Sequence, residues 1–123
     1  MAIKVLIADD SLMFRKLIER YLQNQPDVLV VGIAVDGAEA VTKAKELQPD
    51  VVFLDVDMPD QVTSTTCTAI RQTVPAAKIY LCSAHADPTL KEIAFSTKAD
   101  GIVRKSSLRG DLLKIIRAES KRK

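Results

Sequence analysis

Residues 51–59 read VVFLDVDMP, an apolar run that ends abruptly on Asp55 and is followed by a proline at the next turn. A second apolar run, residues 3–8 (IKVLIA), ends on the acid pair Asp9-Asp10. Short apolar runs that are rich in β-branched residues are typical of buried parallel strands. In an open α/β sheet the functional residues lie outside the carboxyl ends of the strands. The two runs therefore predict one crevice that receives all three acids.

This acid cluster predicts a cation site. Asp57, two residues after Asp55, adds a further acid beside the crevice. Two like charges in close contact repel each other by about 4 kcal/mol at an effective dielectric constant near 20. Such a cluster is favourable only where a cation neutralises it, and carboxylate oxygens with room for water suit Mg²⁺ better than a softer metal.

Two further apolar runs end on residues that suit phosphate chemistry. Residues 78–82 (KIYLC) lead to Ser83 and the small Ala84, and residues 101–104 (GIVR) lead to Lys105. Four strand ends would then bring acids, a hydroxyl and an ammonium to a common rim. This set of groups is typical of phosphoryl transfer, where catalysis is mostly positioning and charge neutralisation. One of the carboxylates can serve as the acceptor.

Helical patterns alternate with these strands and define the fold class. A further strand is expected at residues 28–34, and apolar side chains at helical spacing are expected to form helices at residues 14–22, 36–47, 63–70, 87–94 and 108–116. Five alternations of strand and helix predict an α/β fold, a doubly wound five-stranded parallel sheet. We expect the flavodoxin-like strand order 2-1-3-4-5, with helices on both faces, and one domain over residues 1–123.

The composition excludes several classes of protein. With 47% hydrophobic and 28% charged residues, the chain is expected to fold as a soluble globule. A net charge of +2 is too small to indicate nucleic-acid binding. The first apolar run is about half the length of a membrane span and ends in acids, so no membrane anchor is expected. Cys67 and Cys82 lack metal-ligand or redox spacing, which indicates reduced thiols in a cytoplasmic protein.

Together these motifs resemble the receiver domain of bacterial two-component response regulators, including the chemotaxis regulators. The resemblance covers essentially the whole chain. It rests on five motifs in the expected order: VLIADDS at residues 5–11, PDVVFLD at 49–55, Met58-Pro59, Ser83-Ala84, and ADGIVRK at 99–105. For the acids, the resemblance implies that Asp55 is the phosphorylated residue and that Asp10 binds Mg²⁺ directly. Asp9 would bind the ion largely through water, and the backbone carbonyl of Asp57 would complete the metal site while its side chain faces solvent.

The resemblance also implies a switch. Ser83 would be the switch hydroxyl and Lys105 would bind a phosphoryl oxygen. Ala84 and His85 follow Ser83 directly. His85 is expected to lie in a solvated loop, and the alternative is that it tunes the access of the hydrolytic water. Phosphorylation would then change a face made by the last two helices and the fifth strand.

The chain departs from the family pattern at three positions. Thr63 stands where the family usually has glycine, and the helix that it begins is rich in residues of indifferent helix propensity, so this should be the weakest helix. Ile102 replaces an aromatic residue that swings inward on phosphorylation. Ser106 replaces a proline that is often joined by a cis bond. Acceptor chemistry is expected to be intact, and signal transmission is expected to differ.

The sequence therefore predicts a signalling domain that accepts a phosphoryl group from a histidine kinase or phosphotransfer protein and later hydrolyses it. Its output would be a protein partner or an output domain, with phosphorylation-dependent dimerisation as one outcome. One alternative is a phosphatase of the haloacid-dehalogenase type that uses Asp55 and Asp57, although that class carries its motif on the first strand of a larger chain. Two others are a binding module that accepts no phosphate and the receiver half of a DNA-binding regulator.

Overall fold

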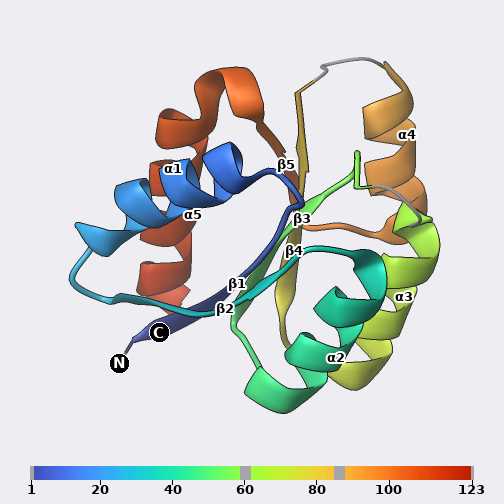
Figure 1. Ribbon diagram of the computed structural model, residues 1–123, viewed down its shortest axis with the longest axis horizontal. Helices are drawn as coiled ribbons and strands as arrows, with labels where there is room; N and C mark the ends of the chain where they lie inside the picture. Colours follow the sequence, from blue (N-terminus) through green and yellow to red (C-terminus); the bar gives the residue numbers. More distant parts are fainter. Residues whose placement is uncertain (1, 59–61, 85–87, 123) are drawn as a thin grey trace.

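The computed structural model describes residues 2–58, 62–84 and 88–122, in which strands and helices alternate along the chain (Figure 1). The strands are β1 (Ile3–Ala8), β2 (Val28–Ala34), β3 (Val51–Asp55), β4 (Lys78–Ser83) and β5 (Gly101–Arg104). The helices are α1 (Leu12–Gln23), α2 (Gly37–Leu47), α3 (Thr63–Thr73), α4 (Pro88–Thr97) and α5 (Leu108–Arg122), with a 3₁₀ turn, η1, at Lys105–Ser107. The predicted alternation of strands and helices is confirmed.

The five strands form one parallel sheet in the order β2-β1-β3-β4-β5, as predicted. Ala8 of β1 is paired with Leu54 of β3, and Asp55 of β3 is paired with Cys82 of β4. Because this register aligns the carboxyl ends of the central strands, the residues that end or follow these strands share one edge of the sheet.

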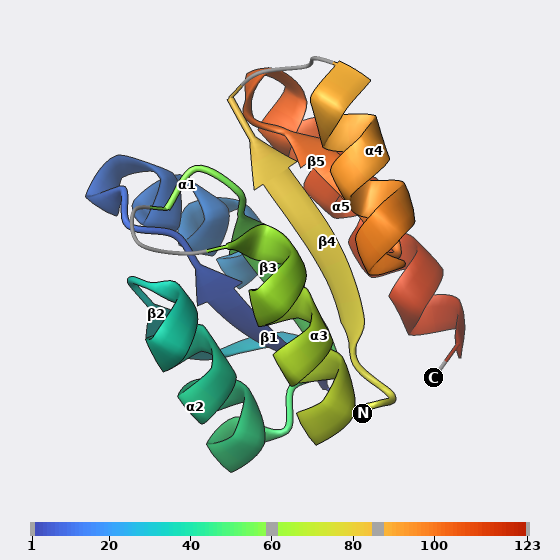
Figure 2. The same ribbon diagram turned by 90° about the vertical axis from the view of Figure 1, so that its right-hand side faces the viewer.

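Helices cover both faces of the sheet, as predicted: α1 and α5 lie on one face, and α2, α3 and α4 on the other (Figures 1 and 2). Alternate residues of β3 supply the two cores. Val52 and Leu54 belong to the core under α2, α3 and α4, whereas Val51 and Phe53 belong to the core under α1 and α5. This explains the unbroken apolar run, because the strand is buried on both faces. Of the helices that the structure describes, none has the length and apolar character needed to cross a membrane.

The caps of the helices differ in quality. The Ser11 side chain accepts a hydrogen bond from the Phe14 N–H at the start of α1, and the Asp36 side chain accepts one from the Glu39 N–H at the start of α2. The residue in the same position before α3 is Val62, which makes no such bond. The expectation that α3 is the weakest helix is consistent with this missing cap.

We expect Val62→Ser to stabilise the protein by about 0.5–1 kcal/mol, because serine can accept a hydrogen bond from an unpaired N–H in the first turn. The Val62 backbone is already extended, as an N-cap requires, and its side chain is 64% exposed, so little packing is lost. Urea unfolding of the wild type, Val62→Ser and the control Val62→Ala would measure this. A serine variant no more stable than the alanine variant would contradict the prediction.

Candidate functional site

Three acids meet at the carboxyl edge of the sheet. Asp9 follows β1, Asp55 ends β3, and Asp10 begins the loop into α1. One carboxylate oxygen from each lies within 4.8 Å of the others. Asp9 and Asp55 are buried, with 1% and 2% of their surface exposed, whereas Asp10 is exposed to solvent. The structure thus brings together the three acids that the sequence placed in one crevice.

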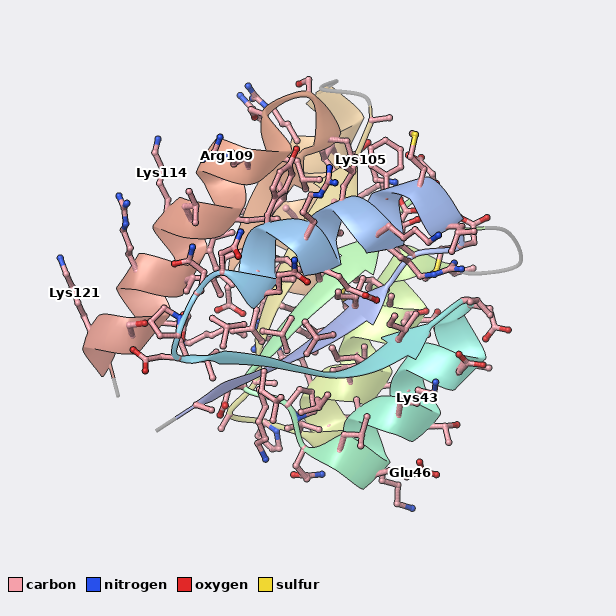
Figure 3. The ribbon with its side chains drawn as sticks, turned by 60° about the vertical axis from the view of Figure 1, so that its left-hand side comes forward. Lys43, Glu46, Lys105, Arg109, Lys114 and Lys121 are labelled. Carbon is pink, nitrogen blue, oxygen red and sulfur yellow. The ribbon has the colours of Figure 1, made fainter. Side chains whose placement is uncertain are left out.

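Lys105 lies among these acids. Its Nζ is 2.9 Å from Oδ2 of Asp9 and 3.5 Å from Oδ2 of Asp55, and its side chain is only 6% exposed. Figure 3 shows Lys105 between α1 and the start of α5, whereas Arg109 and Lys114 extend away from the body of the molecule. Burial opposes the charge of Lys105, but the two carboxylates outweigh it and raise its pKa above the usual value. The ammonium is therefore a fixed positive charge of the site.

The backbone fixes the orientation of both buried carboxylates. Oδ1 of Asp9 accepts a hydrogen bond from the Ser11 N–H at 2.9 Å, and Oδ1 of Asp55 accepts one from the Asp57 N–H at 3.0 Å. Because Oδ1 of each acid is held by the turn that follows it, Oδ2 of each is directed at Lys105. The charged groups are thus preorganised by local backbone structure.

The donor set fits a hard divalent cation. Three carboxylates and one ammonium leave a net charge of −2 when all are ionised, and the exposed Asp10 opens this set to water. Oδ2 of Asp9 is buried and faces the Lys105 charge at 2.9 Å. Oxygen ligands of this kind are those that Mg²⁺ and Ca²⁺ take in proteins. The site can therefore hold such an ion.

The pKa of Asp55 is raised from 3.8 to about 6. Burial is the main cause, and the charge of Asp9 adds to it. The Asp57 N–H and the Lys105 ammonium act in the opposite direction and favour the carboxylate. Asp55 is consequently mostly ionised at neutral pH. Its negative charge lowers the stability of the folded protein, because burial disfavours the ionised form.

We expect Asp55→Asn to stabilise the metal-free protein at pH 7 by about 2 kcal/mol, because asparagine removes the penalised charge. Between about pH 4 and pH 6 the unfolded chain loses the Asp55 proton while the folded protein keeps it, so that ionisation costs stability as the pH rises. The stability difference between variant and wild type should grow through this window and then stay constant. Urea unfolding in EDTA at several pH values tests it, and a difference independent of pH would contradict it.

The other predicted site residues surround this centre. Ser83 is buried at the end of β4, and Ala84 is exposed just beyond it. The side chain of Asp57 is exposed, as expected. Ile102 is partly buried on β5, where it packs against the core under α2, α3 and α4. His85 lies outside the described residues.

The first turn of α1 contributes two contacts that the sequence did not reveal. Arg15 donates a hydrogen bond from its guanidinium to the backbone carbonyl of Asp9 at 2.9 Å. The centre of the Phe14 ring lies 4.1 Å from Nζ of Lys105. In the sequence, the indication of these contacts was the short separation between Asp9-Asp10 and the start of the helix, which places the first turn of α1 near the carboxyl edge of the sheet.

Comparisons with known proteins identify the family of the chain. Residues 5–117 match the response regulator receiver domain family. Over 117 residues the chain is 33% identical to the response regulator protein VraR of Staphylococcus epidermidis, covering 95% of this chain and 56% of VraR. A segment of 59 residues is 54% identical to a protein-glutamate methylesterase/protein-glutamine glutaminase of Syntrophomonas wolfei, covering 48% of this chain and 17% of that protein. The matched part of the chain thus corresponds to between about one sixth and just over half of the length of these relatives.

Solved structures have the same fold. The signal receiver domain of NarL from Mycobacterium tuberculosis superimposes with a TM-score of 0.87 at 32% identity, covering 98% of this chain and 97% of that domain. The receiver domain of AraT from Geobacillus stearothermophilus has a TM-score of 0.83 at 28% identity, with complete coverage of both chains. The phosphatase alternative is not supported, since Asp55 ends the third strand rather than the first. The chain belongs to the receiver-domain family of two-component response regulators.

Proposed function

We propose that Asp55 accepts a phosphoryl group from a histidine kinase or a phosphotransfer protein in a Mg²⁺-dependent reaction. The observation that carries this proposal is the setting of the Asp55 carboxylate: one oxygen is fixed by the Asp57 N–H, and the other faces the Lys105 ammonium beside two further acids. A phosphoryl group on that second oxygen would meet a positive charge on one side and a cation site on the other. Family membership supports the same assignment.

The acids would hold the ion. Asp9, Asp10 and Asp55 supply carboxylate oxygens, and the backbone carbonyl of Asp57 is proposed as a further ligand. When bound, Mg²⁺ supplies positive charge that neutralises the phosphoryl oxygens during transfer. Oδ1 of Asp9 accepts the Ser11 N–H, so its buried Oδ2, which also faces the Lys105 ammonium, is the oxygen that would face the ion or its water.

In the transfer itself, the only covalent change in the protein is at the carboxylate of Asp55. A carboxylate oxygen of Asp55 forms a bond to phosphorus while the bond from phosphorus to the donor's histidine nitrogen breaks, and the electron pair stays on that nitrogen. Lys105 binds a phosphoryl oxygen through its compact ammonium. Hydrolysis later returns Asp55 to a carboxylate, with water supplying the oxygen that leaves with phosphorus. The domain is accordingly a signalling domain with autodephosphorylation rather than an enzyme for an external substrate.

The phosphoryl group would act as a switch by adding a charge of about −1.5 to −2 to a buried position. Ser83, buried at the end of β4, is proposed to donate a hydrogen bond to it, while Lys105 moves from the acids to a phosphoryl oxygen. Both residues flank the face formed by α4, β5 and α5, which we propose as the surface for a protein partner or output domain. We further propose that the domain acts as one unit in the cytoplasm, in keeping with its two free, buried cysteines, and contacts neither membrane nor nucleic acid directly.

Incubation with acetyl phosphate and Mg²⁺, followed by intact-mass measurement, tests the proposal. The wild type and the control Asp57→Asn should gain one phosphoryl group, because the Asp57 side chain is exposed and only its backbone is required. Asp55→Asn should gain none, and EDTA should prevent the gain in every protein. Equal labelling of Asp55→Asn would refute the assignment.

The oligomeric state of the activated domain is a separate question that gel filtration decides. The domain is run with and without a beryllofluoride phosphate mimic and Mg²⁺. A shift to a dimer would support a receiver that dimerises on phosphorylation, and an unchanged monomer would support a domain that acts through a different protein.

A further inference from the structure

The Lys105 ammonium has an aromatic neighbour in addition to its two acids. Its Nζ lies 4.1 Å from the centre of the Phe14 ring, within the distance at which a cation and an aromatic face attract each other. The same nitrogen is 2.9 Å from Asp9 and 3.5 Å from Asp55. We propose that Phe14 is a positioning residue that holds Lys105 for the phosphoryl group. This inference rests on the proposed function, because it assigns a role toward the same reaction.

The position of the ring is set by the fold. The Phe14 N–H donates to the side chain of Ser11, which caps α1, and the neighbouring Arg15 is anchored to the carbonyl of Asp9. The start of α1 is therefore fixed to the end of β1 on both sides of Phe14. Since Asp9 is also the closer partner of Lys105, the ring and the acid that hold the ammonium belong to one rigid turn.

The ring supplies what the acids cannot. A lysine side chain that is only 6% exposed loses most of its hydrating water, and the carboxylates replace that water on their own side only. The face of the Phe14 ring offers electron density toward the ammonium and, being apolar, excludes water there. A less hydrated ammonium interacts more strongly with an anionic oxygen, because the local dielectric constant is lower.

This role makes two predictions that core packing alone does not. First, the contact should depend on the aromatic ring and not on apolar volume, so Phe14→Tyr should preserve it and Phe14→Leu should remove it. Second, any effect of Phe14 on binding of a phosphoryl group should act through Lys105. Phe14 is partly buried within the core under α1 and α5, so leucine can occupy much of the same space.

The contact is tested in the free protein by NMR. Because Cε of Lys105 is bonded to the nitrogen that lies over the ring, its protons should resonate upfield of those of exposed lysines. They should stay upfield in Phe14→Tyr and return to the ordinary position in Phe14→Leu. This measurement needs neither metal nor phosphate, so it decides the contact even if the proposed function fails. Unchanged Lys105 resonances in a folded Phe14→Leu would overturn the inference.

The role is tested by a double-mutant cycle that measures the affinity for the beryllofluoride mimic with Mg²⁺. Phe14→Leu should weaken mimic binding roughly 3- to 30-fold, which corresponds to the strength of a partly desolvated cation–π contact, and Phe14→Tyr should restore it. In a Lys105→Ala background, Phe14→Leu should change the affinity by less than about twofold. The same loss in both backgrounds would mean that Phe14 acts through packing, which overturns the proposal. A wild type that binds no mimic would instead refute the proposed function, with the NMR result standing on its own.

Discussion

Asp10→Asn is expected to abolish phosphorylation of Asp55 while leaving the fold intact. Asp10 is the exposed member of the acid cluster, and its carboxylate lies with those of Asp9 and Asp55 within ligand distance of one ion. A bound metal contributes several kcal/mol to the stabilisation of transferring phosphoryl oxygens, and each 1.4 kcal/mol is tenfold in rate. We therefore expect the rate with acetyl phosphate to fall at least about 100-fold.

Stability should move in the opposite direction. Removing one of three neighbouring negative charges relieves repulsion, so the urea midpoint of the metal-free variant should stay level or rise. Asp27→Asn is a matched control, because Asp27 is an exposed acid far from the site. Its backbone carbonyl accepts a hydrogen bond from the N–H of Ile3, at the end of β1 opposite to the acid cluster. This substitution changes the net charge equally and should leave the phosphorylation rate unchanged. Normal phosphorylation of Asp10→Asn would show that the metal assignment is wrong.

Ser83→Ala is expected to separate phosphorylation from its output. The acids and Lys105 remain, so Asp55 should still be phosphorylated, but the hydroxyl that would draw β4 toward the phosphoryl group is gone. A hydrogen bond to a charged group contributes about 1.5–3 kcal/mol, so the equilibrium between inactive and active forms should shift by roughly 10- to 100-fold. The loss of the output response should be nearly complete, because Ile102 cannot take over the role of the Ser83 hydroxyl. A partly buried, β-branched side chain has few rotamers and little reason to change its burial.

Backbone chemical shifts with and without the beryllofluoride mimic test this prediction. In the wild type we expect the largest changes between residues 83 and 90, with little change at Ile102. In Ser83→Ala the changes in that segment should largely disappear although the mimic still binds. Changes centred on Ile102 in the wild type would contradict the prediction.

The fold and the residues at the carboxyl edge of the sheet could be predicted from the sequence, because both depend on the local pattern of apolar and polar residues. Each apolar run corresponds to a strand, and the runs of β1 and β3 are buried almost throughout, so that the polar residue that ends or follows each of them lies at the carboxyl edge of the sheet. Parallel register then aligns these ends, so Asp9, Asp55, Ser83 and Lys105 follow directly from the positions of the strands. The indifferent helix propensity of residues 63–70 was also visible in the sequence, whereas the missing side-chain cap at Val62 became apparent only in the structure.

Contacts between side chains from distant elements could not be predicted. Phe14 and Lys105 are far apart in sequence and meet only because α1 and the end of β5 lie on the same side of the rim. Asp100, which looks like an ordinary turn residue, accepts hydrogen bonds from the Ile79 N–H and from Arg71. Such pairings depend on rotamers and on the packing of helices against the sheet, and periodicity carries no information on either.

The central claim is that Asp55 is the residue that carries the phosphoryl group. Borohydride reduction of the acyl phosphate, followed by peptide mapping, tests it most directly, because reduction converts only the modified aspartate to homoserine. We expect homoserine at position 55 when acetyl phosphate and Mg²⁺ are both present, and none when EDTA replaces Mg²⁺. Homoserine at Asp9, Asp10 or Asp57 instead, or reduction at Asp55 that is independent of Mg²⁺, would contradict the assignment.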